Sequence, residues 1–241
     1  MLSAINLSTG ELNQVATLSG TTQVSAIGYN IKDSYLYGID KRGDGSFLIK
    51  IGCDGETLDV GQLSPDITND FTIGDVDNNG HGWFTNTQDF NVYEVDLDPT
   101  SSTYGMITNR GAAVPPAGNT PGDWAYVPEG GDLLYSITSD TIQTPPANNV
   151  LSFSMSTYDW AIVVSYAQVD PNNVFAGADN TIYAEATDGQ IYQFSITGSD
   201  APSQPLTSTP ILESDGALCI ASIATYKHTI ENIMEMGQWG W

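Results

Sequence analysis

Five short segments of the chain each carry two apolar residues three positions apart, with at least one polar residue between them. These apolar pairs are Leu2/Ile5, Leu48/Ile51, Val92/Val95, Val150/Phe153 and Ile191/Phe194. Each segment stands between clusters of turn residues, and a shorter apolar stretch follows it. Strand-length runs between turns are typical of β-structure, and no helical periodicity competes with them before residue 225. The pattern predicts an all-β chain.

A second pattern is an apolar strand, a turn rich in Asn, Asp, Pro or Gly, and a further strand with an aromatic residue near its start. The aromatic positions are Tyr37, Phe84, Tyr135 and Tyr183, separated by 47, 51 and 48 residues. Repeats of this length are typical of propeller blades and solenoid turns. The two patterns together give four strands per repeat, and such a meander must pack against neighbouring copies to bury both faces. We therefore predict a β-propeller of about five four-stranded blades.

The ring is predicted to close with strands from both ends of the chain. Residues 2–18 match the third and fourth strands of a blade, and residues 215–222 match a returning innermost strand. This shared blade would lack its second strand. The propeller is assigned to residues 1–224. Residues 225–241 do not match the repeat, and they are open to interpretation as a short docking helix, an assembly element, or sequence unrelated to the domain.

The net charge of the chain limits the classes of partner that it is expected to bind. Six basic residues against 29 acidic ones give a formal net charge of -23. Nucleic-acid binding needs clustered basic side chains, which the chain lacks, and anionic membrane surfaces are disfavoured for the same reason. No apolar run is long enough for a membrane helix. The acidity favours solubility in an extracellular or salty medium, with calcium or a cationic ligand as the alternative. Cys53 and Cys219 could form a disulfide or stay as buried thiols.

Signals for catalysis are few. His81 and His228 are the only histidines, one in a predicted turn and one in the tail, which argues against a His-based triad and excludes a three-histidine metal site. No nucleophile elbow or phosphate-binding loop is present. A pair of carboxylates acting on a glycosidic bond is compatible with so many acidic residues, but no spacing selects a pair. The sequence therefore leans towards a protein that is not an enzyme.

One stretch resembles the start of a calcium-binding loop. Asp75, Asp77 and Asn79 precede Gly80, but Asn86 stands where a calcium loop of the EF-hand type needs glutamate. The stretch also aligns with the first turn of the other repeats. An ordinary tight turn is the favoured interpretation, and calcium is the only cofactor that the sequence suggests.

Two long loops are the candidate place of a ligand site, although tolerated insertions are the favoured interpretation of them. Residues 109–120 and 139–148 each contain a Pro-Pro pair, and both are expected on the same face of the propeller. Arg110, Asp123 and Trp124 accompany the first loop. An aromatic ring beside a carboxylate suits a carbohydrate, whereas packing of Trp124 between blades is the alternative, and the favoured one. The candidate ligand-binding residues are Arg110, Asp123, Trp124, Tyr126 and Asp75, the last two placed in one channel-facing column with Gly28 and Gly177.

Four segments resemble a known family: GYNIKDSYLYGID at 28–40, GDVDNNGHGWF at 74–84, GDWAYVPEGGDLLYSI at 122–137 and SDGALC at 214–219. They are similar to a family of secreted fungal and bacterial repeat domains that are expected to be propellers and have no assigned activity. The resemblance covers most of residues 1–222. It implies an extracellular location and supplies no catalytic residues.

The function predicted from the sequence is that of an extracellular, non-catalytic module that binds a glycan or a protein. The alternative is a hydrolase or lyase acting on polysaccharide through carboxylates in the channel. A structural or assembly role without a small ligand is the third possibility. The sequence does not determine the oligomeric state.

Overall fold

The computed structural model describes most of the chain up to residue 197. The described residues are 2–6, 9, 11–43, 45–52, 54–64, 67, 70–140, 147–167, 171–176, 180–186, 190–197, 206–207 and 217. Among them, no helix is long and apolar enough to cross a membrane.

The described strands form four sheets of four strands and one sheet of two strands. The two-stranded sheet pairs β1 (Leu2–Ile5) with β2 (Leu12–Ala16). The first full sheet contains β3 (Val24–Asn30), β4 (Tyr35–Arg42), β5 (Gly45–Ile51) and β6 (Thr57–Gln62). The second contains β7 (Ile73–Val76), β8 (His81–Thr85), β9 (Asn91–Asp96) and β10 (Ile107–Ala112).

The third full sheet contains β11 (Trp124–Tyr126), β12 (Leu133–Asp140), β13 (Ala147–Ser154) and β14 (Trp160–Ala167). A single turn of 3-10 helix, Pro128–Gly130, connects β11 to β12. The fourth contains β15 (Pro171–Ala176), β16 (Thr181–Ala186), β17 (Gln190–Ser195) and β18 (Leu206–Thr207). Every pairing within these sheets is antiparallel and joins strands that follow each other in the chain.

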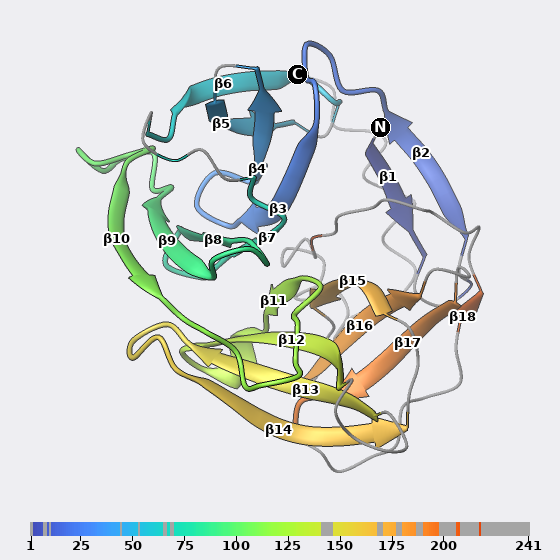
Figure 1. Ribbon diagram of the computed structural model, residues 1–241. Coiled ribbons are helices and arrows are strands. Elements are labelled where there is room, and N and C mark those ends of the chain that lie inside the picture. Colours follow the sequence, from blue (N-terminus) through green and yellow to red (C-terminus); the bar gives the residue numbers. More distant parts are fainter. Residues whose placement is uncertain are drawn as a thin grey trace.

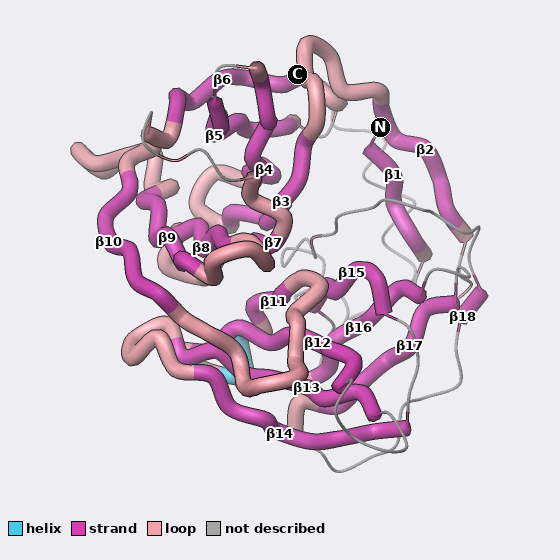
Figure 2. Tube along the Cα trace, viewed as in Figure 1, coloured by secondary structure: helices cyan, strands magenta, loops and turns pink. Residues whose placement is uncertain are grey.

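The sheets are arranged around a ring, as Figures 1 and 2 show. The first strand of each full sheet (β3, β7, β11 and β15) lies towards the centre, and the last strand lies at the rim (Figure 1). The small β1–β2 sheet lies between the fourth and the first full sheets in the ring (Figure 1). This arrangement confirms the predicted all-β propeller class.

The residues that predicted the repeat occupy equivalent positions. Tyr37, Phe84, Tyr135 and Tyr183 lie on the second strands β4, β8, β12 and β16. The apolar pairs of the first pattern lie on the third strands, and in the four full sheets all eight of these side chains are buried: Leu48, Ile51, Val92, Val95, Val150, Phe153, Ile191 and Phe194. Both members of a pair are buried because a blade packs on both of its faces.

The core lies between the sheets rather than within any one of them. One buried cluster joins the first and second sheets, another the second and third, and another the third and fourth. The predicted ring closure involves residues 215–222, of which the structure describes only Ala217. That closure therefore stays a prediction. The same holds for the assignment of residues 225–241 to a tail and for the state of Cys53 and Cys219, because these residues lie outside the described ones.

Candidate functional site

Two predicted site residues, Asp75 and Asp123, connect the inner strands of neighbouring sheets. Asp75 on β7 accepts a hydrogen bond through Oδ2 from the backbone N–H of Tyr126 on β11, at 2.7 Å. In the opposite direction, Asp123 accepts one through Oδ1 from the backbone N–H of Gly74 on β7, at 3.3 Å. Each carboxylate also accepts from the backbone N–H of the residue that follows it. We call this reciprocal pair of contacts the inter-blade clamp.

The position of β7 and β11 in their sheets explains why the inter-blade clamp forms. An innermost strand has a sheet neighbour on one side only, so N–H groups on its other edge need partners from elsewhere. Asp75 and Asp123 provide such partners across the gap between β7 and β11, and both side chains are buried. The two carboxylates therefore hold the second and third sheets together.

Trp124, the predicted stacking residue, lies in the core between the second and third sheets. It is 1% exposed. Its ring stacks on Phe153 with centroids 5.3 Å apart and on Trp160 at 6.1 Å. Its Nε1–H donates to the carbonyl of Trp83 at 3.1 Å. The structure thus places Trp124 among other rings, in the packing role that the sequence favours.

Tyr126 lies beside Trp124 and is also buried. Burial and the neighbouring Asp77 carboxylate raise the pKa of its hydroxyl. The predicted column of Gly28, Asp75 and Tyr126 is displaced in the structure. The residues paired with the aromatic positions of the second strands are Gly28, Gly74, Ala125 and Phe175. Asp75 and Tyr126 each lie one residue further along, so their side chains leave the opposite face of the strand.

The predicted calcium stretch forms a tight turn between β7 and β8. Asp77 Oδ1 accepts the backbone N–H groups of Asn79 at 2.8 Å and His81 at 3.0 Å. Its Oδ2 accepts the indole N–H of Trp83 at 3.2 Å. Asn79 is exposed. Asn86 caps a different turn, accepting from the N–H groups of residues 88 and 89.

His81 lies between two acidic side chains next to this turn. Its Nδ1 is 3.5 Å from Asp77 Oδ2 and 3.3 Å from Glu94 Oε1. Burial raises the pKa of Glu94, and the charge of His81 opposes that shift. Over the part of the chain that the structure describes, no three His, Cys, Asp or Glu residues are arranged to hold a metal ion.

We expect Asp77→Ala to lower the free energy of unfolding by about 2 kcal/mol, because it removes a charged acceptor from buried N–H groups. Thermal melts recorded in calcium and in chelator should shift by the same amount. The matched control is Asn79→Ala, at the exposed position of the same turn, with a smaller effect. A loss that is seen only in calcium would contradict the turn-capping role and support the metal.

Arg110 is placed differently from the other candidates. The sequence assigns residues 109–120 to a loop, but residues 109–112 belong to β10, where Arg110 pairs with Tyr93 of β9. The loop assignment is wrong there because the segment NRGA, despite its turn-forming composition, completes the ladder with β9. The loop therefore begins at Ala113 and ends before β11. Arg110 is exposed on the outermost strand, whereas Asp75 and Asp123 belong to the inner edge.

The other long loop is also shorter than predicted. β12 and β13 remain paired as far as Asp140 and Ala147, so only residues 141–146 are left, outside the described residues. The first loop is fixed to the same sheet: the Oδ1 atom of Asn119 accepts from the amide of Asn149 at 2.7 Å, and the hydroxyl of Thr138 donates to the carbonyl of Thr120 at 2.7 Å.

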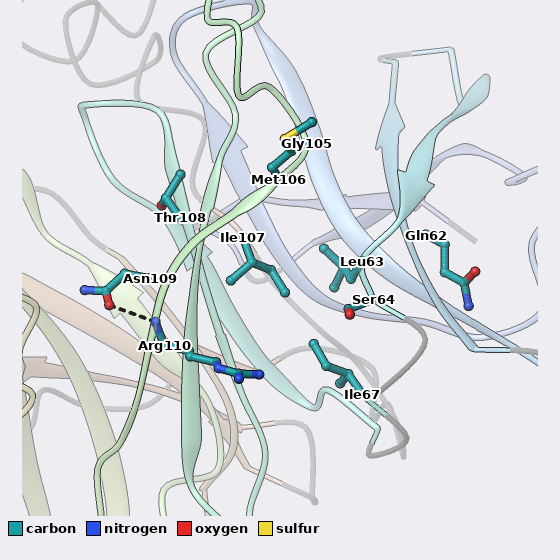
Figure 3. Close-up of a pocket in the computed structure, with 10 residues that line it drawn as sticks. All are labelled: Gln62, Leu63, Ser64, Ile67, Gly105, Met106, Ile107, Thr108, Asn109 and Arg110. Carbon is teal, nitrogen blue, oxygen red and sulfur yellow. Dashed lines mark hydrogen bonds between the residues drawn. The ribbon is translucent and has the colours of Figure 1, made fainter.

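Arg110 lines an open groove between the outermost strands of the first and second sheets (Figure 3). Its volume is about 560 Å³. The lining residues are Gln62, Leu63, Ser64, Ile67, Gly105, Met106, Ile107, Thr108, Asn109 and Arg110. Figure 3 shows the Arg110 side chain extending from β10 towards the side formed by Ser64 and Ile67. The Asn109 side-chain oxygen accepts the backbone N–H of Arg110 at 2.9 Å, which fixes the direction of the Asn109 amide.

Most of these groove residues were not identified by the sequence. The groove combines the end of β6 with the start of β10, and these segments come from different repeats. The only local signal was Arg110, a rare cation in an acidic chain.

The ring of four-stranded antiparallel sheets defines a β-propeller. The chain belongs to the family described as a repeat of unknown function (DUF6923), whose profile matches residues 2–221. A comparison with curated proteins found no significant match.

Solved structures of similar fold include a gluconolactonase from Xanthomonas campestris. It is 16% identical, with a TM-score of 0.55 over 82% of this chain and 66% of that one. A virginiamycin B lyase from Staphylococcus aureus is 15% identical, with a TM-score of 0.48 over 84% of this chain and 62% of that one. The chain thus spans less than two thirds of the length of either, and at this identity the likeness concerns the fold.

Proposed function

We propose that the protein is an extracellular, non-catalytic binding module that holds an acidic glycan in the groove between β6 and β10. The observation that carries the proposal is the composition of the groove. Among the described residues that line it, one is cationic and none is acidic, in a chain with six basic and 29 acidic residues. A glycan with carboxylate or sulfate groups would be repelled by most of this protein and attracted here.

The side chains of the groove suit such a ligand. The guanidinium of Arg110 can hold a carboxylate or sulfate group with two parallel hydrogen bonds. Gln62, Ser64 and Asn109 supply amide and hydroxyl groups of the kind that bind sugar hydroxyls. Met106 and Ile107 offer apolar surface to the C–H face of a sugar ring. A groove open to solvent is also compatible with one segment of a longer polymer.

Binding is favoured over catalysis by the position of the carboxylates. Glycosidic cleavage uses two carboxyl groups on either side of the bond, one of them protonated. The described residues of the groove lining include none, and Asp75 on β7 and Asp123 just before β11 are buried acceptors of backbone N–H groups. They also lie at the inner edge of their sheets, whereas the groove lies between outermost strands. The hydrolase or lyase alternative therefore has less support from the geometry.

We expect Arg110→Ala to weaken binding of a uronic-acid oligosaccharide about 10-fold or more, since a hydrogen bond to a charged group contributes about 1.5–3 kcal/mol. Binding would be measured by calorimetry, with a neutral oligosaccharide of equal length for comparison. Lys41→Ala is the matched control: it removes one positive charge at a surface ion pair with Asp70, outside the groove.

Equal losses in Arg110→Ala and Lys41→Ala would mean that net charge, and not the groove, determines binding. Equal affinity of the unaltered protein for neutral and acidic oligosaccharides would contradict the ligand class. Release of shortened products on incubation would replace the binding role with an enzymatic one.

A further inference from the structure

The outermost strand of the third sheet, β14, is unusual for an edge strand. It runs for eight residues, Trp160–Ala167, with the sequence WAIVVSYA and no charged side chain. In the order of its sheet it has β13 on one side and no strand on the other. A long, uncharged, apolar edge presents a row of backbone groups to which another strand can pair.

The other outermost strands are shorter or carry charge. β6 and β10 have six residues each and include Asp59 and Arg110, respectively. The charge of Asp59 is held in place by two hydrogen bonds from the guanidinium of Arg42. β2 has five residues, and the described part of β18 has two. Short length, charged side chains and β-bulges are the usual means by which proteins protect their edges. The ladder of β14 with β13 has one bulge, at Val163, as the ladders of β6 and β10 also have, but β14 lacks the short length and the charge.

The side chains of β14 divide into an anchored set and an exposed set. Trp160 donates its Nε1–H to the carbonyl of Ala113 at 2.8 Å, and the hydroxyl of Tyr166 donates to the carbonyl of Ser195 at 3.1 Å. The strand is therefore fixed at both ends. Between these anchors, Ile162 is 47% exposed and Val163 is 38% exposed. A fixed strand loses little conformational entropy when a partner pairs with it.

We propose that β14 pairs edge to edge with β14 of a second copy of this chain, antiparallel and across a twofold axis. Such a contact is self-complementary and closed, so it gives a dimer rather than a fibre. The second copy is the occupant that the charges favour: a partner strand with charged side chains would bury them against an uncharged edge, whereas a second β14 brings no charged side chain to the contact. The exposed Ile162 and Val163 side chains would be covered in the same contact.

The net charge gives this dimer a distinctive dependence on salt. Two chains of charge -23 repel each other at a distance, and salt screens this repulsion. Salt does not weaken the apolar contact or the backbone hydrogen bonds of the paired strands in the same way. Association through β14 should thus strengthen as salt rises, opposite to an interface built on ion pairs.

The test measures the mass of the intact protein by sedimentation velocity at about 0.05 M and about 1 M NaCl, over protein concentrations from about 10 to 200 µM. We expect a monomer at low salt and a growing dimer fraction at high salt. Val163→Lys should stay monomeric at both salt concentrations, because a charge would be buried at the paired edge. Val114→Lys is the matched control, since it makes the same change at a 71% exposed valine outside any strand, and it should dimerise like the unaltered protein.

Hydrogen exchange of the backbone amides shows which strand forms the contact between the two copies. In the high-salt dimer, the amides of residues 160–167 should gain protection that Val163→Lys does not show. A monomer at every concentration and salt would overturn the proposal. So would a dimer that Val163→Lys leaves intact, or protection gained on another strand. Association that weakens with salt would indicate a charged interface and would equally reject β14.

Discussion

Replacement of Trp124 by alanine is expected to lower the free energy of unfolding by about 3–5 kcal/mol, the usual loss for a large aromatic residue in a core. The residue is 1% exposed, and its ring contacts Phe153 and Trp160. Removal would also leave the carbonyl of Trp83 without the indole donor that it accepts from. Because these partners belong to two sheets, the cavity would open between blades.

Chemical denaturation measures the loss in the free energy of unfolding. Ligand binding by the folded variant then shows whether Trp124 belongs to the core or to a ligand site. Trp124→Phe keeps an aromatic ring and loses the indole hydrogen bond and part of the ring volume, so a smaller loss than for alanine is expected. Binding in the groove between β6 and β10 should persist in both variants at temperatures where they are folded. If Trp124→Ala kept its stability and lost binding, Trp124 would be a ligand residue and the core assignment would be wrong.

The strands and their order could be predicted because their signals are local. Leu48 and Ile51 stand in one short segment, and their burial follows from the packing of a blade on both faces. The aromatic positions recur because an aromatic ring packs at the same position of the second strand in each blade. Turn-rich composition misled the prediction at residues 109–112, since an outermost strand tolerates Asn, Arg and Gly while its backbone pairs with β9.

The candidate site could be predicted only in part, because its contacts join different repeats. The sequence identifies Asp75 and Asp123 as candidate ligand-binding carboxylates at the channel. It does not show that each accepts a backbone N–H from the neighbouring blade, since this depends on the stagger between β7 and β11. The groove depends in the same way on the approach of β6 to β10. Contacts between sheets are fixed by the ring, and no periodicity within one repeat encodes them.

The inner strands of the first two sheets, β3 and β7, approach each other so closely that no side chain fits between them at one position. Gly28 on β3 faces the backbone of β7, and a Cβ atom at this position would lie 2.4 Å from the backbone nitrogen of Val76. It would also lie 2.7 Å from the carbonyl carbon of Asp75. Atoms of the backbone cannot move aside as the end of a side chain can. Alanine here would force β3 and β7 apart.

We therefore expect Gly28→Ala to lower the free energy of unfolding by about 3 kcal/mol, the upper end of the usual cost of overpacking. Displacement of Asp75 would also strain the inter-blade clamp to Tyr126, so the effect should extend to the third sheet. Gly61→Ala is the matched control: Gly61 lies on β6, and its added Cβ would meet nothing within 4 Å. That change should be neutral or stabilise by about 0.5 kcal/mol, because alanine restricts the unfolded chain. Denaturant midpoints of the two variants provide the measurement, and equal midpoints would show that β3 and β7 do not approach as closely as described.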